Sequence, residues 1–197
     1  MTESPSEAAV APDATGVAQK FAALVGSEAY SADFGTARVR VPADGWLDAH
    51  RTLKEQLPYF SWLSAIDWAN EVSVGDPPEG EVEERFEVLS CLGNPSTGEW
   101  MILSTELPKD GAALPTLREV FGGADWHERE THEMFGITFT GHPNLTHLYL
   151  PDAFEGNPLR KTYPLLSREV KPWPGMVDVE GMPGSDDDDT DDAGGDE

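Results

Sequence analysis

Histidine and glutamate side chains gather in one stretch of the sequence, which raises the question of a metal site. Four of the five histidines and three glutamates lie within 21 residues, namely His127, Glu128, Glu130, His132, Glu133, His142 and His147. Metal ligands that share a helix are usually three or four residues apart, but His127 and His132 are five apart and point about 140° away from each other. No HExxH motif occurs in the sequence. We therefore expect hydrogen-bonded or surface histidines and no metal ligands in this chain.

Motifs for cofactors and nucleophiles are also absent from the sequence. Cys91 is the only cysteine, whereas a disulfide needs two thiols and an ordinary iron–sulfur cluster needs four ligands. The sequence contains no GxGxxG, GxxxxGK[ST] or GxSxG motif. We expect Cys91 to be a small buried residue of a strand, and we predict no catalytic and no cofactor-binding residue in this chain.

The net charge of −24 restricts the possible partners. Nucleic acids and anionic lipids are bound by basic patches, so we expect neither nucleic-acid binding nor direct docking on a membrane. The longest apolar stretch, Tyr59 to Ala69, is too short to span a bilayer and contains Asp67. The N-terminus has Glu3 and Glu7 where an export signal would be basic, so we expect a cytoplasmic protein.

Two charged segments contain residue types that suit contacts with another protein. Glu128, Arg129 and Glu130 are consecutive on a predicted helix, so their side chains point in three directions and at least one should face inward or toward a partner. The segment PLRKTYPL, residues 158–165, places two basic residues between prolines in an extended shape that suits an acidic protein surface. A solvated charged loop is the alternative for this segment. The candidate interface residues are Glu128, Arg129, Glu130, His142, Arg160, Lys161 and Tyr163.

The elements of the first half follow from hydrophobic spacing. Residues 14–26 predict an amphipathic helix that ends at Gly26, which can adopt the left-handed conformation. Residues 36–41 alternate between apolar and polar as in a strand. Residues 46–57 predict a second helix, which Asp44 can cap.

The second half predicts a hairpin and then helices. Residues 84–92 and 100–105 suit two strands around the turn GNPSTG, whereas residues 60–68 are ambiguous between a strand and a buried loop. Pro115 can open a short helix that ends at Gly122. Asp125 can cap another helix, which has Glu128 at the capping-box spacing and stops at Gly136.

Composition divides the chain into four parts. Residues 1–13 and 185–197 are polar, low in complexity and acidic, and we expect both tails to be disordered. Residues 14–140 should form one α+β domain of two layers, with a small mixed sheet packed by helices. Residues 141–184 contain seven of the 16 prolines, and we expect this extended Pro-rich C-terminal segment to wrap the surface of a partner.

An ordered series of short motifs resembles the 30 kDa subunit family, or C-subunit family, of respiratory complex I. The motifs are WHERETHEMFGI (residues 126–137), GHP (141–143), LYLPD (148–152) and EGNPLRKTYPL (155–165). Weaker likeness reaches back to residue 14. His132 and Thr162 depart from the family, whose members more often have an aromatic and an acidic residue at these places.

The resemblance implies a non-catalytic structural subunit of the peripheral arm of a proton-translocating NADH:quinone oxidoreductase. Its implied neighbours are the subunit that forms the quinone pocket and the subunit that carries the terminal Fe-S cluster. FMN, the Fe-S clusters and the quinone would all be bound by partner subunits, and this chain would reach the cytoplasmic face of the cell membrane only through them. The alternative is the equivalent subunit of a related membrane-bound hydrogenase or ferredoxin/quinone oxidoreductase complex.

Overall fold

The computed structural model describes residues 13–73 and 76–164. The two predicted tails and the end of the Pro-rich segment lie outside these residues, apart from Asp13, so the division into four parts stays a prediction. Asp13 is the N-cap of helix α1 (Ala14–Val25), where its side chain accepts hydrogen bonds from the amides of Thr15 and Gly16. Gly26 ends the helix with φ 68°, as expected from its conformational freedom.

A five-stranded mixed sheet forms the centre of the fold, in the order β1-β2-β5-β4-β3. Strands β2 and β5 are parallel, and the other pairs are antiparallel. The bounds of the strands are β1 Tyr30–Ser31, β2 Ala37–Arg40, β3 Tyr59–Trp68, β4 Arg85–Asn94 and β5 Glu99–Leu107. The predicted hairpin is therefore confirmed as β4 and β5, and the ambiguous residues 60–68 lie in a strand.

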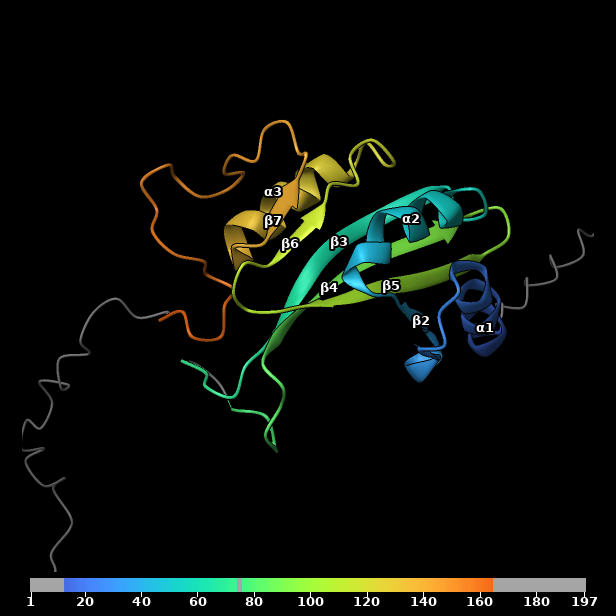
Figure 1. Ribbon diagram of the computed structural model, residues 1–197, viewed down its shortest axis with the longest axis horizontal. Coiled ribbons are helices and arrows are strands. Elements are labelled where there is room, and N and C mark those ends of the chain that lie inside the picture. The colour runs from blue at the N-terminus through green and yellow to red at the C-terminus, as the bar shows by residue number, and fades with distance from the viewer. Residues whose placement is uncertain (1–12, 74–75, 165–197) are drawn as a thin grey trace, which may run out of the picture. The chain divides into compact units, whose positions relative to one another are not determined.

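Helices cover one face of this sheet (Figure 1). Helix α2 (Trp46–Lys54) is joined to it by His50, whose Nε2 lies 2.7 Å from Ser90 Oγ on β4. Helix α3 (Ala124–Phe135) places Phe135 against Phe86 of the same strand, with ring centroids 6.4 Å apart. The α+β fold with a mixed sheet packed by helices is thus confirmed.

The other face of the sheet carries a network of ion pairs. Glu87 is 2% exposed and its Oε1 lies 3.1 Å from Arg38 Nη2, while Arg85 Nε lies 2.8 Å from Glu106 Oε1. Because each carboxylate has a guanidinium beside it, the charges on this part of the sheet largely compensate one another.

Three local predictions were wrong. Ala113–Pro115 forms strand β6, which pairs in parallel with β7 (Thr138–Thr140), so Pro115 ends a strand and opens no helix; turns follow it. Asp44 lies in a short 3-10 helix, η2 (Ala43–Gly45), and Gly45 is the N-cap of α2 without a side-chain cap. The capping box of α3 is missing because Gly123 is the N-cap, without a side-chain cap, and Asp125 lies inside the first turn; Glu128 accepts its hydrogen bonds from a distant segment instead.

Candidate protein-docking site

Helix α3 and residues 141–164 form the candidate site, which we call the α3 platform. Gly136 ends the helix in the left-handed conformation at φ 76°, and the chain then turns back along it. Ala124, Glu128, Thr131 and Phe135 are the buried residues at helical spacing that face the core. Glu133 is also buried, although it lies on a different side of the helix.

Glu128 binds the loop that follows β6. Its side chain is 0% exposed, and its two oxygens accept hydrogen bonds from the Leu117 amide at 2.6 Å and from Thr116 Oγ1 at 2.5 Å. Burial raises the pKa of Glu128 to about 7, although these hydrogen bonds favour the charged form and oppose the shift. The carboxyl group therefore titrates near neutral pH.

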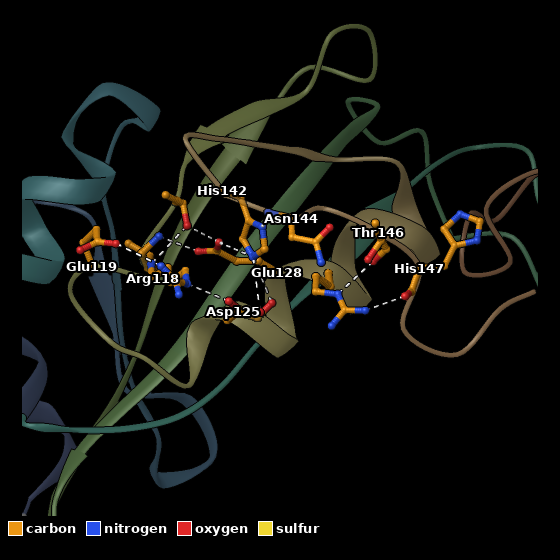
Figure 2. Close-up of polar contacts among 11 residues, drawn as sticks. Arg118, Glu119, Asp125, Glu128, His142, Asn144, Thr146 and His147 are labelled. Carbon is orange, nitrogen blue, oxygen red and sulfur yellow. Dashed lines mark hydrogen bonds and ion pairs between the residues drawn. The ribbon is translucent and has the colours of Figure 1, made fainter. Parts of the chain in front are cut away.

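His142 lies against Glu128 inside the protein, and Figure 2 shows the two side chains pointing toward one another. The His142 side chain is fully buried, with Nε2 4.0 Å from Glu128 Oε2 and 3.8 Å from Asp125 Oδ1. Its Nδ1 accepts a hydrogen bond from the Asn144 amide at 3.2 Å, so we assign the proton to Nε2, which lies 3.3 Å from the Asp125 carbonyl oxygen. This arrangement fixes the start of the returning segment.

Glu133 and Arg129 bind the middle of that segment. The Glu133 oxygens accept hydrogen bonds from the amides of Leu148 and Tyr149, at 2.7 and 2.9 Å. Arg129 donates to the carbonyl oxygens of Thr146 and His147, at 3.0 and 2.7 Å (Figure 2). One acidic and one basic side chain thus satisfy donors and acceptors of four consecutive residues of an otherwise irregular backbone.

The end of the described segment is held at the C-terminus of α3. The Leu159 amide donates to the Met134 carbonyl oxygen at 3.1 Å, and Arg160 Nε donates to the Phe135 carbonyl oxygen at 2.7 Å. The Lys161 amide donates to Asp67 Oδ2 at 2.9 Å, which joins the segment to β3. Because carbonyls at a helix C-terminus attract cations, Arg160 also suits the helix dipole there.

Lys109 completes this end of the site. Its ammonium group pairs with Asp67 and lies 4.5 Å from the centre of the Phe86 ring. Burial, together with the nearby charge of Arg160, lowers the pKa of Lys109 to about 8.

Large apolar side chains remain exposed on the α3 platform even though its backbone is well held. Trp126, Tyr149 and Leu159 are 63%, 64% and 51% exposed. Exposed aromatic residues on an ordered backbone are typical of protein interfaces, because little conformational entropy is lost when they are buried. This surface is therefore suited to bind another protein.

The structure brings the seven sequence-predicted interface residues together on the α3 platform but gives them different positions. The side chains of Glu128 and His142 face the interior, so they act on a surface only through the segments that they hold. Glu130 is half-buried on α3, and Lys161 is exposed while its backbone is held. Tyr163 stacks on Phe154, with ring centroids 6.2 Å apart. Their contact with a partner stays a prediction.

Glu133 and Asp67 are structural anchors, a role that the sequence reasoning predicted for neither of them. A signal for Glu133 is that the segment returning along its helix lacks secondary structure, because the amides of such a backbone need acceptors. Within residues 13–73 and 76–164, no group of three or more histidine, cysteine or acidic side chains is placed to hold a metal ion. His132 instead places Nδ1 2.8 Å from the Ile137 carbonyl oxygen.

The fold is shared with a solved structure. A trypsin-resistant fragment of Nqo5 superposes with a TM-score of 0.53 at 22% identity, covering 65% of this chain and 98% of the fragment. A family model described as "Respiratory-chain NADH dehydrogenase, 30 Kd subunit" matches residues 39–169. The chain belongs to this family.

Similar proteins include separate subunits and fused ones. An NADH-quinone oxidoreductase C-subunit from Rhodopseudomonas palustris is 35% identical over 69% of this chain and 63% of its own length. One from Roseiflexus castenholzii is 33% identical over 75% of this chain and 79% of its own length. A C/D-subunit of the same oxidoreductase from Pectobacterium atrosepticum is 47% identical over 71% of this chain but only 23% of its own length. The match thus spans less than two thirds of the first and last of these relatives.

Proposed function

We propose that this chain is a structural subunit of the peripheral arm of a proton-translocating NADH:quinone oxidoreductase and has no catalytic centre of its own. Its family and the names of its relatives support an NADH:quinone oxidoreductase over the related hydrogenases and ferredoxin-linked complexes. The complex passes electrons from NADH through FMN and Fe-S clusters to a quinone. In this proposal the partner subunits bind all these cofactors, and this chain holds its neighbours in place.

The observation that carries the proposal is the exposed aromatic surface of the α3 platform. Its backbone is held by buried carboxylates, so Trp126 and Tyr149 are presented on an ordered support. The proposed partners are the subunit that forms the quinone pocket and the subunit with the terminal Fe-S cluster. The chain would lie at the cytoplasmic face of the cell membrane through these partners, and no helix of its described residues is long and apolar enough to cross a bilayer.

Replacing Trp126 and Tyr149 together by serine tests the proposal. Both side chains are exposed, so we expect the isolated chain to keep its melting temperature. We expect the chain to be lost from the oxidoreductase when the complex is purified from membranes, because the aromatic anchors of the interface are gone. Leu24→Ser is the control. Leu24 is an exposed apolar residue of α1 and does not belong to the α3 platform, so this variant should be incorporated normally. Normal incorporation of the double variant would contradict the proposal.

A further inference from the structure

A row of polar side chains joins helix α3 to two other segments of the chain (Figure 2). Arg118 Nε lies 2.8 Å from Asp125 Oδ2, and Asp125 Oδ1 lies 3.8 Å from His142 Nε2. His142 Nε2 lies 4.0 Å from Glu128 Oε2, which accepts the hydrogen bond from Thr116 Oγ1. These groups therefore connect the loop after β6 and the start of the segment after β7 with the first half of α3.

Glu128 has no permanently charged cation beside it in the described part of the chain. Its carboxyl group is 0% exposed, and the one basic group within ion-pair distance is His142. The Arg118 guanidinium is paired with Asp125 and Glu119 instead, at 2.8 and 3.3 Å. The carboxylate of Asp125 adds a like charge near Glu128. An ionised Glu128 is therefore a buried negative charge that only a protonated His142 could compensate.

The hydrogen bonds of His142 oppose its protonation. Its Nδ1 accepts a hydrogen bond from the Asn144 amide at 3.2 Å, which it can do only without a proton. A proton on Nδ1 would place two donors against each other, so a charged His142 must give up the Asn144 amide. The proton of Glu128 thus has no favourable alternative place: its transfer to His142 breaks this contact, and its loss to solvent leaves a buried, uncompensated charge.

We propose that Glu128 and His142 form a proton-linked latch, in which one proton on the Glu128 carboxyl group keeps residues 141–144 closed against α3 and loss of that proton to solvent opens them. Opening hydrates the carboxylate, which relieves the cost of its burial. Residues 141–144 begin the segment that carries Tyr149 and Leu159, so the latch regulates how firmly this part of the α3 platform is held. The inference rests on the proposed function only for the effect on docking, because the latch itself is a property of the isolated chain.

Amide hydrogen exchange of Leu117 and Asn144, measured by NMR on the isolated full chain, tests the latch. Burial holds the pKa of the Glu128 carboxyl group at about 7 in the closed latch, against an ordinary value of 4.5 when water surrounds it. Linkage of one proton to opening predicts that the protection of both amides, corrected for their intrinsic exchange rates, falls about 20-fold between pH 5.5 and pH 7.5. The ¹³C signal of the Glu128 carboxyl carbon should titrate near pH 7, and titration entirely below pH 5 would overturn the inference.

Glu128→Gln separates the titration from the packing. The variant keeps a neutral side chain of similar shape, so the protection of the two amides should change by less than about 3-fold between these pH values. Glu130→Gln is the matched control, because Glu130 is half-buried on the same helix and makes none of these contacts, so it should keep the wild-type fall. Unchanged protection in the wild type, or equal falls in the wild type and Glu128→Gln, would overturn the inference. A missing pH response together with docking that depends on Trp126 and Tyr149 would remove the latch alone and leave the proposed function standing.

Discussion

Buried carboxylates are the residues that hold the α3 platform. Glu133 is 2% exposed and accepts hydrogen bonds from two consecutive amides, Leu148 and Tyr149. Hydrogen bonds to a charged group contribute roughly 1.5–3 kcal/mol each, and amides left unpaired in a partly buried segment carry a further penalty. The returning segment therefore depends strongly on this one side chain.

Glu133→Ala should lower the free energy of unfolding by about 2–4 kcal/mol, because both amides lose their acceptor. The control is Glu130→Ala, three residues earlier on the same helix and half-buried. That substitution should change stability by about 0.5 kcal/mol or less. Urea denaturation of the two variants and the wild type measures the difference, and equal losses in both variants would contradict the role of Glu133.

Glu128 makes the stability depend on pH near neutrality. Its folded-state pKa of about 7 lies above the ordinary value of 4.5, so the folded protein holds the carboxyl proton more tightly than the unfolded chain. The contribution of this group is complete below pH 4.5 and is lost as the pH rises through 7. The loss is on the order of 3 kcal/mol.

Glu128→Gln keeps a neutral side chain at every pH, and its amide can still pair with the Leu117 amide and the Thr116 hydroxyl. We expect the variant to gain stability relative to the wild type by about 1–3 kcal/mol between pH 5 and pH 8. Denaturation curves at the two pH values test this. A difference between the two proteins that is the same at both would rule out Glu128 as the titrating group.

At the scale of the elements, the β4–β5 hairpin depends on a close approach. The Trp100 indole lies over Gly93, so a Cβ at position 93 would collide with the ring. The indole also meets Tyr59 of β3 edge to face, with ring centroids 5.5 Å apart. The Trp100 side chain of β5 therefore contacts both Gly93 of β4 and Tyr59 of β3.

Gly93→Ala should cost about 1–3 kcal/mol of stability in the wild-type background, because the indole must move. In a Trp100→Ala background the same substitution should cost about 0.5 kcal/mol or less, since the obstacle is gone. A double-mutant cycle measured by thermal unfolding gives both values. An equal cost in the two backgrounds would show that the backbone, rather than the ring, requires glycine here.

Elements that depend on local signals were predictable from the sequence. Gly26 and Gly136 end their helices as expected, and alternation and turn residues located β2, β4 and β5. The helix expected at Pro115 failed because residues 113–115 pair with residues 138–140, a contact that no local pattern shows. Propensity is overridden where a distant segment supplies hydrogen bonds.

The site was predictable only in part, for the same reason. Three consecutive charges on a helix predicted that at least one faces inward or toward a partner, and Glu128 faces inward. Its partner Leu117 lies 11 residues away in a loop, and the partners of Glu133 lie 15 and 16 residues away in a segment without regular structure. Hydrogen bonds between a helix side chain and an irregular backbone have no sequence period, so their pairing could not be derived.

At the scale of the whole molecule, the sheet separates two exposed aromatic surfaces. The α3 platform packs next to β3 at one edge, and the β1–β2 hairpin with Phe34 forms the other edge. The arginine–glutamate network on the uncovered face keeps that face close to neutral in a strongly acidic chain. Two separate exposed aromatic surfaces on one sheet would suit the proposed role of joining neighbouring subunits.

Oxidative footprinting of the chain, alone and in the purified oxidoreductase, tests the docking role of the α3 platform most directly. Trp126 and Tyr149 are 63% and 64% exposed in the chain and should be oxidised readily when it is alone. In the assembled complex, burial against a partner should slow the oxidation of both by about 10-fold or more. Oxidation of both residues at the same rate in the complex as in the isolated chain would contradict the proposed docking surface.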